Sequence, residues 1–180
     1  MLLEPVAAYV PSEFRVKFVG NPWEKQQAAH LRRMVFCVEQ QLFEHDDTDD
    51  IDAIEVGAIT LAAFACVAGM PEQIAGTVRI HEAEPGVWRG SRLAIHPAFR
   101  GHAHLAAGLI RLAVSSAHAR GCRQFLAQVQ SQNARLFRRL HWQTLREIAI
   151  HGRAHHEMQA DLDWYPPFAD GDCGFVTLDR

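Results

Sequence analysis

The feature that most constrains this fold is a strand, a short loop and a long helix that follow one another between residues 90 and 121. The pattern predicts a strand over Arg92–His96, a loop that carries Arg100 and Gly101, and a helix from about Leu105 to Ala119. The first N–H groups of a helix lack intrahelical partners and carry partial positive charge, so a phosphate is stabilised there. We therefore expect this turn to bind a phosphorylated ligand.

The rest of the chain alternates in the same way between strand and helix patterns. A helix is expected from Pro22 to about Val38, because Asn21 is a good N-cap and proline is tolerated at the first helical position. Residues 69–72 are expected to turn the chain, and the tail 163–180 is expected to be irregular. Strands are expected at Phe14–Val19, Ala53–Val67, Gln73–His81, Phe125–Val129, Gln143–Ile150 and His155–Leu162.

Charge is distributed unevenly although the formal net charge is only −3. Eight carboxylates lie between Glu39 and Glu55, whereas nine arginines and one carboxylate lie between Ala98 and Arg153. This asymmetry favours a site with an acidic mouth at one end and an arginine-rich wall for an anionic ligand at the other. For any single arginine, solvated surface charge is the alternative interpretation. The net charge gives no reason to expect that the protein binds nucleic acid.

Length and composition fit one globular domain, with a core over about residues 14–162, an N-terminal arm over 1–12 and the tail. No apolar run reaches the ~18 residues of a membrane span, and the first residues do not resemble a signal peptide. The four cysteines are far apart, which argues against a disulfide framework. We expect a cytoplasmic protein that binds no membrane; the oligomeric state, including a homodimer, stays open.

The strand, loop and helix resemble the pyrophosphate-binding motif of the GNAT superfamily of acyl-CoA N-acyltransferases, usually written Gln/Arg-x-x-Gly-x-Gly/Ala. Arg100 and Gly101 fit this pattern, whereas Ala103 stands where glycine is expected and Leu105 where glycine or alanine is expected. The resemblance therefore implies an altered coenzyme A site.

The segment Asn133–Trp142 resembles a second GNAT motif, Asn-x-x-x-Phe-Tyr-x-x-Leu-Gly-Phe, with Phe137 at the first aromatic position. Arg138 replaces the tyrosine, which is the family's usual proton donor to the departing thiolate, and His141 replaces the glycine. A thiolate with a pKa of ~8.5 is a tolerable leaving group, so the loss weakens catalysis only mildly. Arg138 has two open interpretations, a contact to a coenzyme phosphate or a solvated helix face.

The resemblance implies an α/β GNAT fold, a mixed and mostly antiparallel twisted sheet flanked by helices. Two central strands should splay apart and admit the acyl-CoA, the co-substrate, with a strand amide stabilising the oxyanion. The residues expected to bind it are Leu93, Ala94, Ile95, Arg100, Gly101, His102, Ala103, His104, Leu105, Asn133, Phe137 and Arg138.

The sequence also resembles the acyl-homoserine-lactone synthases, which place an arginine, a phenylalanine four residues later and spaced aspartates in their first-helix region. Arg32 and Phe36 match, although simple core packing is the plainer interpretation of Phe36 and Val38. Arg79 and Arg92 lie in apolar strands and need partners. We expect these among Asp46, Asp47, Asp49, Asp50 and Asp52. Lactone synthases have a glutamate three residues before the strand arginine, where this chain has Arg89.

Transfer to a primary amine requires that the ammonium lose a proton, and Glu39, Glu82 and His155 are the candidate bases. His151, His155 and His156 lack the spacing and carboxylates typical of a metal site, so no metal is expected. The sequence therefore predicts acyl transfer from acetyl-CoA or another acyl-CoA to a small-molecule amine, with a cationic acceptor favoured by the acids. The alternatives are a lactone-synthase-like acyltransferase and a non-catalytic CoA-binding module.

Overall fold

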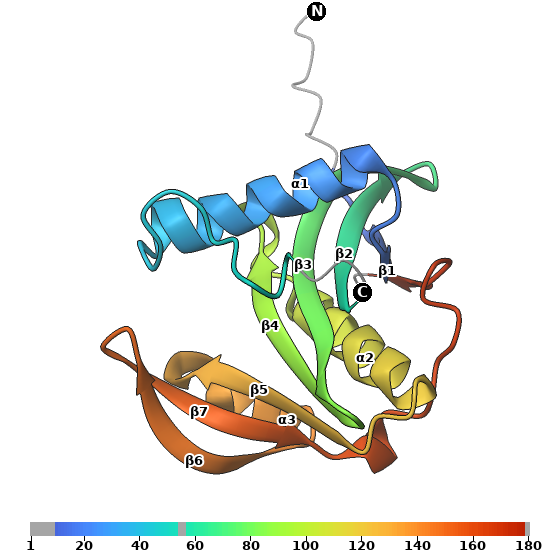
Figure 1. The fold of residues 1–180 in the computed structure, drawn as a ribbon. Coiled ribbons are helices and arrows are strands. Elements are labelled where there is room, and N and C mark those ends of the chain that lie inside the picture. Colours follow the sequence, from blue (N-terminus) through green and yellow to red (C-terminus); the bar gives the residue numbers. More distant parts are fainter. Residues whose placement is uncertain (1–9, 54–56, 179–180) are drawn as a thin grey trace, which may run out of the picture.

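The structure, a computed structural model, describes residues 10–53 and 57–178. These residues form an eight-stranded sheet in the order β6-β7-β5-β4-β3-β2-β1-β8, with helices on both faces (Figure 1). Neighbouring strands are antiparallel except β4 and β5, which are parallel, so the expected mixed sheet is confirmed. The strands are β1 (Glu13–Phe18), β2 (Ala58–Val67), β3 (Met70–Glu84), β4 (Val87–Ile95), β5 (Gln124–Gln130), β6 (Trp142–Ile150), β7 (Arg153–Ala160) and β8 (Phe175–Leu178).

Two long helices cover opposite faces of this sheet. The helix α1 packs Ala28 and Leu31 against Phe64 and Ile74 of β2 and β3. On the other face, α2 buries a stripe of leucines in the larger core cluster. The helices are α1 (Pro22–Arg33), the π-helix η1 (Met34–Glu39), the short 3-10 helices η2 (Pro97–Phe99), η3 (Ser131–Asn133) and η4 (Leu162–Trp164), α2 (Ala103–Ala119) and α3 (Ala134–Arg139).

The start of α1 agrees with the sequence prediction. The Asn21 side chain accepts a hydrogen bond from the backbone N–H of Glu24 at 2.8 Å, and the Glu24 carboxylate accepts one from the Asn21 N–H at 3.3 Å. This reciprocal capping box satisfies two N–H groups that the helix itself leaves without partners.

The end of this helix differs from the prediction of a continuous α-helix to Val38. From Met34 to Glu39 the chain is a π-helix, in which the N–H of Gln40 donates to the carbonyl of Val35 at 2.9 Å. The wider turn changes which side chains face the sheet, because each residue then rotates by less than 100° about the axis. Phe36 is buried, but Val38 is 70% exposed, so its predicted place in the core is wrong.

Two connections also differ from the prediction. The hairpin between β2 and β3 turns at Ala68 and Gly69, which have φ values of 50° and 77°, and the strand resumes at Met70. Two residues with positive φ match the twist of paired strands, so a longer turn is unnecessary. In the tail, β8 pairs with β1 and covers an edge that would otherwise expose unpaired backbone groups.

Parts of three expected segments lie outside the described residues, one of them being residues 179–180 of the tail predicted over 163–180. The other two are residues 1–9 of the N-terminal arm and residues 54–56 of the apolar stretch predicted over Ala53–Val67.

Candidate active site

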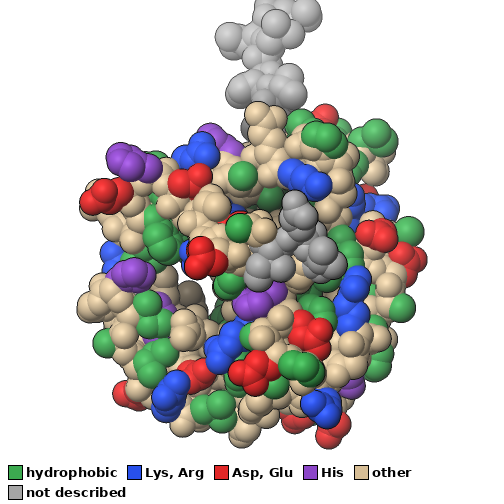
Figure 2. Space-filling model, in the orientation of Figure 1, with side chains coloured by type: hydrophobic (Ala, Val, Ile, Leu, Met, Phe, Trp, Pro, Cys, Tyr) green, Lys and Arg blue, Asp and Glu red, His purple; other side chains and the backbone are tan. Residues whose placement is uncertain are grey.

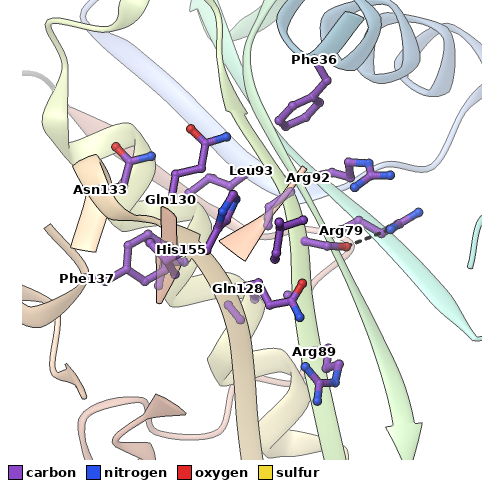
Figure 3. A pocket seen from close by; sticks show the side chains of 18 of the residues that line it. Phe36, Arg79, Arg89, Arg92, Leu93, Gln128, Gln130, Asn133, Phe137 and His155 are labelled. Atoms are coloured by element: carbon purple, nitrogen blue, oxygen red, sulfur yellow. Dashed lines mark hydrogen bonds between the residues drawn. The ribbon is translucent and has the colours of Figure 1, made fainter. Parts of the chain in front are cut away.

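The two central parallel strands separate part-way along their length. Register pairs join β4 to β5 from Val87 opposite Gln124 to Gly90 opposite Ala127, and none joins the described strands beyond that point. A cavity of about 490 Å³ lies at the opening, lined mainly by β3, β4, β5, α2 and the loop after η1 (Figure 3). The space-filling view shows this side of the molecule hollowed, with acidic, basic and histidine side chains near the opening (Figure 2).

A β-bulge in β4 lies at this separation. On β4 the chain advances by three residues from Ser91 to Ala94, whereas the opposite segment of β3, from Arg79 to Thr77, advances by only two. The β4 segment therefore contains one extra residue. Within the bulge Arg92 has a φ of 56°, an uncommon conformation for a residue with a side chain. The extra residue changes the direction of successive side chains, and it brings Leu93 to the cavity wall.

The bulge also determines which backbone amides face the opening. The N–H of His96 donates to the carbonyl of Ala75 on β3 at 2.8 Å. Because amides alternate sides along a strand, the N–H of Ala94 is expected to face β3 as well, and those of Leu93 and Ile95 to face away from it. Of these two residues, Leu93 lines the cavity.

The far side of the cavity is a hydrocarbon wall. The Phe137 and Trp142 rings meet edge-on with centroids 5.1 Å apart, and Phe125 meets Trp142 at 5.7 Å. This wall offers no charged group to a ligand, so it suits an apolar chain. It consists of Ile110, Ala113 and Val114 from α2 together with Phe125, Phe137 and Trp142.

The near side contains a network of three arginines and three aspartates. Arg79 is only 1% exposed, which is rare for a charged side chain and requires full pairing. The predicted pairing of the strand arginines with the aspartate cluster is therefore confirmed. The ion pairs join Arg32 to Asp47 and Asp52, Arg79 to Asp49 and Asp52, and Arg92 to Asp47 and Asp49, at 2.6 to 3.1 Å.

These contacts hold Asp49 and Asp52 in their charged form. Burial raises the pKa of the Asp52 carboxyl, but hydrogen bonds from Arg32 and Arg79 outweigh burial, so the pKa is well below its usual range. Asp49 shows the same balance, with Arg79 as the main stabilising partner, and its pKa is also lowered. The acids near the cavity are thus already neutralised by arginines.

A second polar group lies on β3 and β4 beside this network. His81 and Arg89 are register partners, and both line the cavity. His81 is 8% exposed, and its Nδ1 has no hydrogen-bond partner among the described residues. Burial, with Arg79 and Arg89 nearby, lowers the pKa of this imidazole, so His81 is neutral at pH 7.

His155 lines the cavity from β7, close to Gln130 and Phe137 (Figure 3). Its Nδ1 lies 2.9 Å from the carbonyl oxygen of Arg153, and a carbonyl can only accept. The neutral ring therefore carries its proton on Nδ1 and leaves Nε2 as a hydrogen-bond acceptor. Nearby, the Gln130 side chain donates to the Gln40 side chain at 2.9 Å and links β5 to the segment after η1.

The helix α2 begins close to the end of β4. The first turn of α2 receives no hydrogen bond from the side chain of its N-cap residue, His102. A Cβ added to Gly101 would meet nothing within 4 Å, so the loop has open space beside it. Arg100 binds Glu39 through two hydrogen bonds, at 2.6 and 2.7 Å. This arrangement can hold an anion if Arg100 exchanges its carboxylate partner.

The family model for the acetyltransferase (GNAT) family matches residues 27–142, which is more than half of the chain and includes the split strands, the bulge and α2. The chain belongs to the acetyltransferase (GNAT) family. A comparison with curated protein sequences finds no match.

Solved structures with the GNAT fold resemble the chain over most of its length. An acyl-CoA N-acyltransferase from Pseudomonas aeruginosa has a TM-score of 0.64 at 19% identity, covering 82% of this chain and 99% of its own. Escherichia coli ElaA has a TM-score of 0.67 at 14% identity, covering 82% and 98%. BjaI, a CoA-dependent acyl-homoserine lactone synthase, has a TM-score of 0.62 at 14% identity, covering 83% of each chain. These likenesses show a shared fold.

The structure of this GNAT protein brings only part of the predicted site together. Leu93, Asn133, Phe137 and His155 all line the cavity. The remaining coenzyme residues on the loop and first turn of α2, from Arg100 to Leu105, lie outside its lining, and the Leu105 side chain is fully buried in the core.

Two of the predicted bases are not cavity residues. Glu39 is bound to Arg100, and Glu82 accepts a hydrogen bond from the Gly86 N–H at 2.8 Å, in the turn between β3 and β4. Arg138 also lies outside the cavity lining and donates to the Thr144 hydroxyl at 3.2 Å.

Sequence reasoning missed His81, Gln128 and Gln130, which line the cavity. A signal was available for His81, since it lies two residues after Arg79 and so shares its face of the strand. The glutamines gave no such signal, because polar residues in a short strand are equally common on a solvated face.

The described residues include no group of three histidines, cysteines or carboxylates that could hold a metal ion. Within the same part of the chain, no helix is long and apolar enough to cross a membrane.

Proposed function

We propose that this GNAT protein transfers an acyl group from an acyl-CoA to a primary amine by direct attack on the thioester. The observation that carries the proposal is the cavity between the split strands β4 and β5, with the bulge at Arg92 on one wall. The acyl-CoA would enter here as a co-substrate, so the protein needs no resident cofactor.

The start of α2 supports a binding site for the coenzyme pyrophosphate. Its first turn is not capped by the His102 side chain, and the position that a Cβ on Gly101 would occupy faces open space. Arg100 would exchange the Glu39 carboxylate for a phosphate oxygen, since both are anions that a guanidinium binds through two parallel hydrogen bonds. Asn133 and Phe137 in the cavity wall would contact the pantetheine arm.

The backbone N–H of Leu93 is our proposed donor to the thioester oxygen. It is expected to face the opening, and a donor fixed by a strand costs no reorganisation when negative charge develops on that oxygen. His155 is the proposed base, because its Nε2 is an acceptor and its side chain lines the cavity. It would take a proton from the ammonium so that the neutral amine attacks the thioester carbonyl. The nitrogen of the tetrahedral adduct gives its second proton to solvent, the C–S bond breaks, and the sulfur leaves as a thiolate, because Arg138 does not reach the cavity as a proton donor.

The apolar wall supports an acyl chain longer than acetyl. The rings of Phe125, Phe137 and Trp142 and the α2 side chains surround space that an acetyl group would leave largely unfilled. Each methylene buried there contributes ~0.8 kcal/mol, so chain length should affect affinity strongly.

A lactone-synthase-like activity is the second candidate. The network of Arg32, Arg79 and Arg92 with three aspartates favours it, as does the fold likeness to BjaI. Arg89 weighs against it, because lactone synthases place a glutamate at this position. The aspartates no longer argue for a cationic acceptor, since each one is bound by arginines.

The first test is a thermal-shift titration with CoA and a series of acyl-CoAs, run on wild type and Arg100→Ala. A ligand at a hundred times its dissociation constant adds about 2.7 kcal/mol of stability, which raises the melting temperature measurably. We expect a shift in wild type, a smaller shift in Arg100→Ala, and CoA release when amines are added. Binding without release across an amine panel would support the non-catalytic module instead, and no shift at millimolar ligand would refute the proposed coenzyme site.

A further inference from the structure

Arg89 presents a cationic group to the cavity that its neighbours only partly neutralise. Its side chain is 36% exposed, and both of its terminal nitrogens lie 3.4 Å from one oxygen of Glu157, a long contact for an ion pair. The other Glu157 oxygen already accepts a hydrogen bond from Arg146 at 2.7 Å. Two guanidinium groups therefore share one carboxylate, which leaves an excess of one positive charge among the described residues at this point of the wall.

The other charged groups around the cavity do not balance this excess. The three arginines of the neighbouring network are matched by three aspartates. His81 is buried beside Arg89 and neutral, because burial and the charges of Arg79 and Arg89 lower its pKa, against a weaker opposing effect of Asp49. Among the described residues that line the cavity, the uncompensated charge is therefore that of Arg89.

The position of Arg89 relates this charge to the reaction centre. Arg89 and His81 are opposite each other in the antiparallel pair, so their side chains share the face of the sheet on which Arg79 meets the aspartates. Arg89 lies four residues before Leu93 on the same strand, which is about 13 Å of extended backbone. The Arg89 side chain, the acceptor and the thioester must together span the distance from Arg89 to Leu93. A small acceptor, whose anionic group is close to its amine, suits this distance.

We propose that the acceptor is an amino acid, and that Arg89 determines this specificity by binding its carboxylate. The inference rests on the proposed acyl transfer and adds the class of acceptor. A guanidinium with donors still open binds a carboxylate through two parallel hydrogen bonds, a geometry that an uncharged amide does not reproduce. A polyamine or other purely cationic acceptor would meet repulsion from Arg89.

The test compares acceptors that differ only in the anionic group: leucine, leucinamide and isopentylamine. For each we would measure kcat/KM for CoA release and, independently of turnover, the dissociation constant by calorimetry with CoA present. We expect wild type to favour leucine over leucinamide by roughly ten- to hundred-fold, the effect of a charge-assisted hydrogen bond. Arg89→Gln should abolish this preference while the melting temperature shift with CoA remains, and Arg89→Lys should retain part of it.

Two further variants should respectively increase the preference for leucine over leucinamide and leave it unchanged. Glu157→Gln removes the competing carboxylate, so the preference for leucine should increase. Arg120→Gln alters an exposed arginine at the end of α2 and should leave the preference unchanged. Rates with succinyl-CoA and acetyl-CoA as donors show whether Arg89 binds a carboxylate of the acyl donor instead of one of the acceptor. If Arg89→Gln changes only the preference between these donors, the proposal is overturned.

The outcomes distinguish this inference from the proposed function. Turnover of all three acceptors at equal efficiency would refute the amino-acid specificity and leave acyl transfer standing. If nothing is acylated, equal calorimetric affinities for leucine and leucinamide would still refute it, whereas an Arg89-dependent preference would support the subsite without the reaction.

Discussion

Arg100 and Glu39 bind each other through two parallel hydrogen bonds, between Nη1 and Oε1 at 2.6 Å and between Nη2 and Oε2 at 2.7 Å. The sequence assigned these residues to different tasks, Arg100 to the coenzyme pyrophosphate and Glu39 to proton transfer. In the folded chain the end of η1 and the loop before α2 bring them together. A pyrophosphate on Arg100 must therefore compete with a carboxylate of this protein.

This competition predicts that Glu39→Gln binds CoA more tightly than wild type, because Arg100 is then released from its partner. The pair is exposed, so its loss should change the free energy of unfolding by less than about 1 kcal/mol. Calorimetric titration with CoA measures the effect, with Arg100→Ala expected to weaken binding. A loss of turnover with unchanged CoA affinity would instead identify Glu39 as the base.

Arg79→Ala should destabilise the protein severely. Arg79 is 1% exposed and bonded to Asp49 and Asp52, so its removal leaves each of these two partly buried carboxylates short of one arginine partner. Breaking a buried pair from one side typically costs roughly 3–5 kcal/mol. Urea denaturation would give the value. Arg33→Ala, which breaks an exposed contact to Asp46 at 3.9 Å, is the matched control and should cost less than about 1 kcal/mol.

The same network predicts acid sensitivity. The pKa values of Asp49 and Asp52 are lower in the folded chain than their ordinary value of 3.8. Their contribution is therefore complete above that pH and is lost as the pH falls through the folded-state values. The free energy of unfolding should decline below about pH 4, and Asp52→Asn should make that decline shallower. Denaturation curves at pH 7, 4 and 3 test this; parallel declines would contradict it.

His155→Gln should lower kcat by roughly 10²- to 10⁴-fold, the usual contribution of a positioned base, while CoA affinity is retained. Stopped-flow measurement of CoA release under saturating acyl-CoA would separate the chemical step from binding. His156→Gln is a matched control on the neighbouring position of β7, because His156 is buried but does not line the cavity. Equal losses in both variants would argue for a structural effect.

Ala113→Leu should select against long acyl chains. Ala113 is 3% exposed on α2, and a larger side chain there would occupy the apolar end of the cavity. We expect kcat/KM to fall for octanoyl-CoA and to change little for acetyl-CoA, with overpacking costing about 1–3 kcal/mol of stability. An equal decrease for both donors would place the acyl chain elsewhere.

Much of the fold could be predicted from local patterns. The alternation of Phe14, Val16 and Phe18 predicted β1, and all three side chains are buried. Asn21 and Pro22 predicted the start of α1, and Gly121 with a φ of 86° follows the end of α2 as expected. These features depend on neighbours in the sequence, which is why they can be read without a structure.

The partners of Arg79 and Arg92 were also predictable, because a charge in an apolar strand requires a counter-charge and the aspartate cluster was the nearest supply. The specific pairing was not, since it depends on how the loop after η1 crosses the sheet.

The sequence alone predicted the order of most strands and helices and the need to neutralise buried arginines, since each follows from local propensity or from the cost of burying charge. Only the tertiary structure decided that Arg100 meets Glu39, that the Glu82 carboxylate binds the turn between β3 and β4, and that His81, Arg89 and His155 share a cavity. Those relationships join residues from different strands and loops, and the bulge at Arg92 and the π-helix at Met34–Glu39 set their directions. Such irregularities arise from packing between distant segments, which local sequence patterns do not encode.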